Sequence, residues 1–334
     1  MSVATMRAAV LYDVDDVRIE PRAIPALHDG DVLVRTMASG ICSGDVMAWY
    51  IRRKAPLVLG HEPAGIVEQT RGDAPFAVGD RVFVHHHAPC FDCRACARGE
   101  YVQCKTWRAT SIEPGGIAEY FRVARANLRD TLPLPENVDF ADASLVEPLA
   151  CVLKSLRRSG AAAGDRVYVI GLGVMGLLHV LAARNLGAQV FASDFIGARR
   201  SLAQRNGAQA FFPDDARSVL AEGADVVICG PGTPAAMQAA FESVAPAGTV
   251  VMFTPFPPGV PVTIDAERAY FGDLRFVASY SCGPDDTRAA LDLIERRIVT
   301  AEKLGADLIS LDEVPGAYRA LAEARIIKPI VVFT

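Results

Sequence analysis

Four cysteines are grouped closely in the first third of the chain, at Cys90, Cys93, Cys96 and Cys104. Their spacing, C-x2-C-x2-C-x7-C, suits a closed tetrahedral zinc site made of four thiolates. Such a site leaves no position for water, so we expect this zinc to be structural rather than catalytic. An iron–sulfur cluster, which also uses four cysteines, and a redox role are the alternatives.

Three consecutive histidines, His85, His86 and His87, stand just before this array and look like a ligand cluster. The apolar run from Arg81 predicts a strand that continues to His85. Consecutive residues in a strand face opposite ways, so all three rings cannot converge on one metal. We expect at most one of them to line a pocket and none to be a metal ligand.

A second set of possible ligands is dispersed along the chain, with Cys42, His61, Glu62 and Glu147 as its members. Three of them have ordinary structural explanations: Cys42 as a buried small side chain, His61 as a turn histidine, and Glu147 as a helix N-terminal acid. Together they supply thiolate, imidazole and carboxylate groups. This mixture is typical of a zinc site that keeps one position open for chemistry.

A third feature is a glycine-rich loop between a predicted strand, Val167–Ile170, and an Ala/Leu-rich helix. The loop consists of Gly171, Leu172, Gly173, Val174, Met175 and Gly176. Its glycines allow a sharp turn, close approach of a pyrophosphate, and tight packing of the helix on the strand. A second strand, Gln189–Ala192, leads to Asp194, whose carboxylate can accept both hydroxyls of an adenosine ribose and would repel a 2′-phosphate. NAD is therefore favoured over NADP.

The secondary structure predicted around these groups follows two patterns along the chain. The first 145 residues or so contain short β-like runs separated by Gly, Pro and Asp, which predict a small, irregular β-barrel. From about Ser144 to Cys282 helices and strands alternate, which predicts a doubly wound parallel sheet. Two helices and a strand, Pro329–Phe333, follow, and we expect this last strand to return to the first domain.

The composition excludes several classes of partner. The 334 residues are 51% hydrophobic, and 34 basic against 39 acidic residues give a formal net charge of −5. This balance favours neither nucleic acid nor an anionic membrane as a partner. The N-terminus shows no signal peptide, and prolines interrupt the longest apolar stretch, residues 244–264. We therefore expect a cytoplasmic protein whose clustered cysteines bind metal rather than form disulfides.

Several motifs in order, GIC–GD, GHEPAGIVE, the four-cysteine segment, LVEPLACVLKSL and VIGLGVMG, together with Asp194, give a resemblance that covers essentially the whole chain. The chain resembles the zinc-dependent medium-chain dehydrogenases, in the branch of sorbitol, threonine and glucose dehydrogenases. The resemblance implies an α/β protein with a GroES-like β-barrel catalytic domain, residues 1–150 and 286–334. It also implies a Rossmann NAD-binding domain, residues 151–285.

The resemblance also implies roles for individual residues. Cys42 and His61 would bind a catalytic zinc, and Glu62 would be a ligand or a carboxylate that exchanges with substrate. Glu147 would bind the zinc or its water, and Asp45 would orient the zinc histidine. In the cofactor domain, Arg199 would contact the adenosine ribose.

The proton path departs from the family pattern. The family usually has Ser or Thr two residues after the zinc cysteine and often His at a second relay position, but this chain has Gly44 and Met47 there. Ser43 could substitute if the loop shifts. Otherwise the proton could leave through zinc-bound water and Glu62 or Glu147.

The function implied by the resemblance is oxidation of a secondary alcohol of a polyol, sugar or cyclitol to the ketone. It would need two zinc ions per chain, one catalytic and one structural, and NAD as hydride acceptor. Oxidation of an amino alcohol such as threonine is one alternative, and a non-catalytic binding protein that keeps the fold is another. We expect a small hydroxylated substrate as partner and, by analogy, a homodimer or homotetramer.

Overall fold

The computed structural model describes residues 4–334. The first three residues of the N-terminal stretch, in which we expect no signal peptide, lie outside the described part. The chain divides into two compact units. The first is Met1–Ala150 with Cys282–Thr334, and the second is Cys151–Ser281.

The first unit is built on antiparallel β-structure, with a three-stranded sheet in the order β2-β1-β4 and a larger sheet in the order β15-β16-β3-β5-β6-β8, where β7 also pairs with β3. Its strands are β1 (Thr5–Asp13), β2 (Asp16–Ala23), β3 (Val32–Gly40), β4 (Leu57–Val58), β5 (Pro63–Thr70), β6 (Arg81–Val84), β7 (Tyr120–Val123), β8 (Thr131–Pro133), β15 (Asp307–Ile309) and β16 (Pro329–Val332). Buried β-branched side chains, among them Val34, Val67 and Val84, pack against one another and form one of the unit's apolar clusters.

Short helices connect these strands. They are η1 (Ser43–Val46), α1 (Ala48–Ile51), α2 (Arg94–Ala97), η2 (Tyr101–Gln103), α3 (Lys105–Ala109), η3 (Asn127–Asp130), α4 (Phe140–Ala143), α11 (Pro284–Glu295), η5 (Leu311–Glu313) and α12 (Val314–Ala322). One longer helix, α5 (Val146–Ser159), begins in the first unit and continues into the second.

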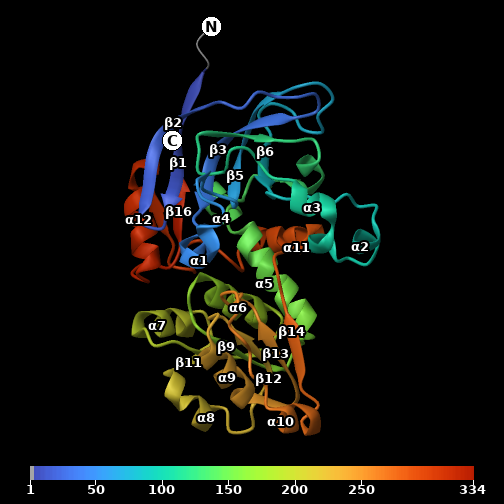
Figure 1. The fold of residues 1–334 in the computed structure, drawn as a ribbon, viewed down its shortest axis with the longest axis vertical. Helices are drawn as coiled ribbons and strands as arrows, with labels where there is room; N and C mark the ends of the chain where they lie inside the picture. Colours follow the sequence, from blue (N-terminus) through green and yellow to red (C-terminus); the bar gives the residue numbers. More distant parts are fainter. Residues whose placement is uncertain (1–3) are drawn as a thin grey trace. The chain divides into compact units, whose positions relative to one another are not determined.

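The C-terminal strand returns to the first unit, as predicted. Figure 1 shows β16, in red, among the blue N-terminal strands. β16 pairs antiparallel with β3, with Ile330 opposite Gly40, and the backbone N–H of Ile41 donates to the carbonyl of Pro329 at 3.0 Å. This pairing brings the residue before β16 to the end of β3, where the segment with Cys42 begins.

The second unit is a doubly wound parallel sheet, and this prediction is confirmed. Its six strands are all parallel and follow the order β11-β10-β9-β12-β13-β14. The strands are β9 (Arg166–Ile170), β10 (Gln189–Ser193), β11 (Gln209–Phe211), β12 (Ala224–Cys229), β13 (Val244–Met252) and β14 (Arg275–Ala278). The connecting helices are α6 (Val174–Asn185), α7 (Gly197–Arg205), η4 (Pro213–Asp215), α8 (Ala216–Val219), α9 (Pro234–Ser243) and α10 (Ala266–Phe271). In sheets of this kind ligands bind beside the carboxyl end of the strand at which the order reverses, and in this order that strand is β9.

In the described part of the chain, no helix has both the length and the apolar character needed to cross a bilayer.

A buried histidine in helix α6 makes the second unit sensitive to acid. His179 is 1% exposed, with its Nδ1 at 2.7 Å from the carbonyl oxygen of Met175 and its Nε2 at 2.7 Å from Ser155 Oγ. Burial lowers its pKa to about 4. Between pH 6.5 and about 4 the unfolded chain therefore gains a proton that the folded chain does not bind, so stability falls as the pH falls.

Replacing His179 with glutamine, which is neutral but still forms hydrogen bonds, is expected to remove this part of the acid sensitivity. Between pH 7 and pH 5 the wild-type chain should lose about 2 kcal/mol more unfolding free energy than His179→Gln does. Urea denaturation at the two pH values measures the difference. An equal loss in both proteins would contradict the assignment.

Candidate metal and cofactor sites

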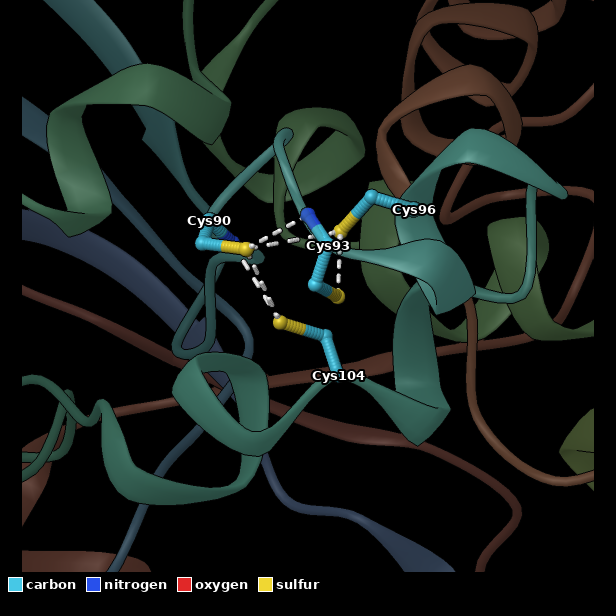
Figure 2. Close-up of side chains that lie close together, drawn as sticks. All are labelled: Cys90, Cys93, Cys96 and Cys104. Carbon is cyan, nitrogen blue, oxygen red and sulfur yellow. Dashed lines mark hydrogen bonds between the residues drawn. The ribbon is translucent and has the colours of Figure 1, made fainter.

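The four clustered cysteines lie in a small lobe in which their sulfur atoms point toward one another (Figure 2). Sulfur–sulfur distances are 3.6 Å for Cys93 to Cys96, 3.6 Å for Cys104 to Cys90 and 3.9 Å for Cys90 to Cys96. A zinc–sulfur bond of about 2.3 Å in a tetrahedron requires sulfurs about 3.8 Å apart. The four thiols therefore fit a closed tetrahedral zinc site.

The surroundings of Cys104 favour its thiolate form, and the lobe has little apolar core of its own. Burial raises the pKa of Cys104, but hydrogen bonds from the backbone N–H groups of Cys90 and Trp107 outweigh it and lower the pKa to about 6. The buried apolar cluster of the lobe consists only of Val102 and Trp107 besides Cys96 and Cys104. A bound metal would therefore supply much of the lobe's stability.

The dispersed ligand set converges at the ends of two neighbouring strands. Cys42 follows the end of β3, and His61 and Glu62 directly precede β5, which pairs with β3. One ligand atom from each of these three residues lies within 4.8 Å of the others. The strand pairing explains this meeting of residues that are distant in the sequence.

An acidic residue lies beside the histidine of this set. Asp45, in η1, is 4% exposed, and its Oδ2 lies 3.7 Å from His61 Nδ1. Burial lowers the pKa of His61, but the charges of Asp45 and Cys42 outweigh it and hold the pKa well above its usual range. Because Nδ1 faces the carboxylate, Nε2 is the ring atom left for a metal.

An unsatisfied carboxylate oxygen supports a metal at this position. Glu62 is 0% exposed, and its Oε2 accepts from the Lys328 ammonium. Its Oε1 is also buried and has no hydrogen-bond partner among residues 4–334. A buried anionic oxygen without a partner is costly. A thiolate, an imidazole and this oxygen together form a donor set that suits zinc.

Glu147 lies close to a different group of donors. It is in the first turn of α5, and its carboxylate forms a cluster with ring nitrogens of His85 and His86, with all three ligand atoms within 4.8 Å of one another. The rings of His61 and His86 are 5.0 Å apart, so the two clusters are adjacent. The structure thus groups Glu62, rather than Glu147, with Cys42 and His61.

The three histidines do not lie on a strand, so the prediction that the strand continues to His85 is wrong. Strand β6 ends at Val84 because its partner β8 pairs only with residues 82–84, so the histidines follow the strand and their rings do not alternate. The rings of His86 and His87 are 4.2 Å apart. His85 is fully buried, with Nδ1 2.6 Å from Asp130 and Nε2 3.6 Å from the Cys282 sulfur. That none of the three binds metal stays a prediction.

The relay positions lie on the turn after Cys42. Ser43 begins η1, and the backbone N–H of Gly44 donates to the Cys42 sulfur at 3.3 Å. A Cβ atom at position 44 would lie 3.4 Å from that sulfur and 3.8 Å from Met47 Cε. At position 44 the group that contacts Cys42 is thus a backbone N–H and not a side-chain hydroxyl.

The glycine loop adopts the form expected for a phosphate-binding turn. Gly171 has φ +86°, and a Cβ at Gly176 would collide with the carbonyl of Gly171. A Cβ at Gly173 would meet nothing within 4 Å, so the protein leaves space beside this residue. Gly173 is also the N-cap of α6 and provides no side-chain cap, which leaves the first N–H groups of the helix available to an anion.

Asp194 follows the end of β10 and accepts a hydrogen bond from the glycine loop. Its Oδ2 accepts from the backbone N–H of Leu172 at 2.7 Å, and its Oδ1 accepts from that of Ile196 at 2.8 Å. Arg199 Nη1 lies 3.9 Å from Oδ2. Each carboxylate oxygen keeps a second lone pair, so both can still accept a ribose hydroxyl.

Comparison with known proteins agrees with this geometry. Residues 28–136 match the alcohol dehydrogenase GroES-like domain, and residues 174–296 match the zinc-binding dehydrogenase domain. The probable D-xylulose reductase A of Aspergillus clavatus is 30% identical over 96% of this chain and 95% of its own. The sorbitol dehydrogenase of Bacillus subtilis is 27% identical over 93% of this chain and 92% of its own.

A solved structure is similar over nearly the whole chain. It is a putative zinc-binding dehydrogenase from Sinorhizobium meliloti bound to NADP, with a TM-score of 0.88 and 30% identity, and the match covers 99% of this chain and 100% of that one.

Proposed function

Because the chain belongs to the zinc-containing medium-chain dehydrogenases and is a zinc-dependent NAD(P)-linked alcohol dehydrogenase, we propose that it oxidises a secondary alcohol of a polyol, sugar or cyclitol to the ketone. The observation that carries the proposal is the convergence of Cys42, His61 and Glu62 in a partly buried site, with a Glu62 oxygen that is buried and has no partner among the described residues. The named relatives, a xylulose reductase and a sorbitol dehydrogenase, support the polyol class.

Cys42, His61 and Glu62 would hold the catalytic zinc, with Glu147 as an additional carboxylate for the zinc or its water. When bound, zinc acts as a Lewis acid that makes the substrate hydroxyl easier to deprotonate. Asp45 keeps His61 in the orientation and tautomer that a ligand needs. Four cysteines, Cys90, Cys93, Cys96 and Cys104, would hold the second, structural zinc.

Glu62 and Glu147 are the groups that we propose accept the substrate proton. Gly44 and Met47 cannot relay a proton, and Ser43 lies on the turn one residue before the usual hydroxyl position. Both glutamates are buried, and each belongs to one of the two adjacent donor clusters. A carboxylate held close to the reacting oxygen can take up its proton.

The second unit would bind NAD through residues 171–176, Asp194 and Arg199, and residues 1–150 with 286–334 would form the catalytic domain. NAD accepts the hydride when bound. We propose that NAD is preferred to NADP, although the Sinorhizobium relative is described with NADP. The carboxylate of Asp194 lies 3.9 Å from the guanidinium of Arg199, where it offsets that positive charge and would repel a 2′-phosphate.

Replacing Asp194 with serine is expected to lower the ratio of kcat/KM for NAD to that for NADP about a hundredfold, because it removes a charge that repels the 2′-phosphate. Steady-state kinetics with both cofactors measure the ratio. Asp194→Asn is a companion variant that also removes the charge but keeps a side-chain acceptor. It should shift the ratio in the same direction as Asp194→Ser. A wild-type preference for NADP, or no shift in either variant, would contradict the role of Asp194.

The substrate class is tested by following NADH formation with the purified enzyme across polyols, sugars, cyclitols and threonine. Turnover of a hydroxylated compound without an amino group is the expected result. Selective turnover of threonine would instead make the protein an amino-alcohol dehydrogenase.

We further propose a homodimer or homotetramer that acts in the cytoplasm. β14 pairs only with β13 within the described residues, and Phe276 and Tyr280, on or near this edge, are 41% and 55% exposed. An exposed edge strand of this kind is a ready surface for pairing with a second copy. The thiols of the cysteine lobe need a reducing compartment. The particle mass in solution tests the assembly.

A further inference from the structure

A lysine that the proposed mechanism does not use is completely buried beside the candidate catalytic site. Lys328 is 0% exposed, and its Nζ donates to Glu62 Oε2 and, at 3.3 Å, to the carbonyl of Ile41. Lysine is almost never buried unless its charge is paired. A buried ion pair costs desolvation energy, which makes its position next to a metal ligand informative.

The residues that form this ion pair and its carbonyl contact lie at the ends of three neighbouring strands. Lys328 directly precedes β16, Ile41 follows β3, and Glu62 directly precedes β5, and these three strands are neighbours in one sheet. Gly40 makes room for the pair, because a Cβ there would lie 2.6 Å from Nζ and would also collide with the Glu62 carboxylate. The pair is therefore built into the sheet.

The two oxygens of Glu62 have different surroundings. Oε2 is held by the ammonium of Lys328, whereas Oε1 is buried without a partner among residues 4–334. Glu62 also contributes the ligand atom that lies within 4.8 Å of those of Cys42 and His61. A carboxylate whose charge is already neutralised by an ammonium is a weaker metal ligand than one without such a partner.

We propose that Lys328 is a positioning residue of the catalytic metal site, whose ammonium holds Glu62 and keeps this carboxylate a weak, exchangeable metal ligand. The inference rests on the proposed function, because it assumes a metal at Cys42, His61 and Glu62. It assigns to Lys328 the control of how readily one metal position opens for substrate.

The test uses the full-length enzyme loaded with Co²⁺, whose visible spectrum reports the ligands. The Co²⁺ at the candidate catalytic site is identified by difference, as the Co²⁺ that wild type binds and Cys42→Ser does not. In Lys328→Met, Glu62 loses its ammonium partner and should bind this Co²⁺ more strongly. A chelator should then remove the metal about tenfold more slowly than from wild type, with a changed visible spectrum and a lower kcat.

A second substitution shows whether the effect runs through Glu62. In the double variant Lys328→Met/Glu62→Gln the slow release should disappear, and both charges of the buried pair are removed together, which favours folding. Lys328→Gln keeps a hydrogen-bond donor without the charge. If Lys328→Met does not fold, Lys328→Gln replaces it in the test, and the same slow release of Co²⁺ is expected. Lys303→Met, which removes an exposed lysine of the same C-terminal segment, is the control.

Release rates and spectra equal to wild type in the Lys328 variants would overturn the proposal and leave Lys328 a purely structural residue. Slow release that persists without Glu62 would overturn it as well. If wild type and Cys42→Ser bind the same amount of Co²⁺, the proposed function itself fails, and this result is distinct from the others.

Discussion

Replacing Cys42 with serine is expected to reduce kcat/KM about a thousandfold and to remove one of two metals per chain. A serine hydroxyl is a poor zinc ligand, and Lewis-acid stabilisation of the reacting oxygen contributes several kcal/mol, of which about 4 kcal/mol corresponds to a thousandfold. The side chain of Cys42 lies within 4.8 Å of the ligand atoms of His61 and Glu62. Steady-state kinetics and metal analysis of the same preparation measure both effects.

Cys229→Ser is the matched control for this substitution. Cys229 is a buried cysteine of the second unit, and its thiol lies 3.3 Å from the carbonyl of Pro231, outside the candidate metal clusters. This variant should keep both metals and its activity. If Cys42→Ser retains kcat/KM within a few-fold of wild type, the catalytic role of Cys42 is wrong.

Replacing Cys93 with serine should remove the other metal and lower the melting temperature by roughly 6 °C, the shift that about 4 kcal/mol produces in a chain of this size. The reason is the small apolar cluster of the lobe, which cannot hold residues 90–104 in place without a metal. Thermal unfolding, metal analysis and limited proteolysis in the lobe provide the measurements. The Cys42 site should keep its metal.

Two outcomes would contradict this interpretation of the lobe. An unchanged melting temperature with an unchanged metal content would mean that Cys93 is not a ligand. Detection of iron and acid-labile sulfide in the wild-type protein would show that the lobe holds an iron–sulfur cluster instead of a structural zinc. Cys229→Ser again serves as the control for a cysteine substitution that leaves the metals in place.

The features predicted best from the sequence are those whose residues are close together in the chain. The spacing of Cys90, Cys93, Cys96 and Cys104 brings four sulfurs to one point with little help from the rest of the fold. The loop from Gly171 to Gly176 is similarly local, since strand, turn and helix follow one another directly. The alternation of strands and helices was enough to predict the parallel sheet around this loop.

Contacts between distant segments were harder to predict. Lys328 meets Glu62 across 266 residues, and a lysine before an apolar strand ordinarily indicates a solvent-exposed position. The only sequence signal was the expected return of the last strand to the first domain, which brings Lys328 beside β3. The cluster of Glu147 with His85 and His86 depended on where β6 ends, and the apolar pattern placed that end one residue too late.

The zinc positions can be located by anomalous scattering at the zinc absorption edge in crystals of the active enzyme. We expect two zinc ions per chain, one among the four cysteines of the lobe and one bound by Cys42 and His61 with Glu62 or Glu147 beside it. A fully active enzyme with zinc only in the cysteine lobe would show that Cys42 and His61 do not form a catalytic zinc site.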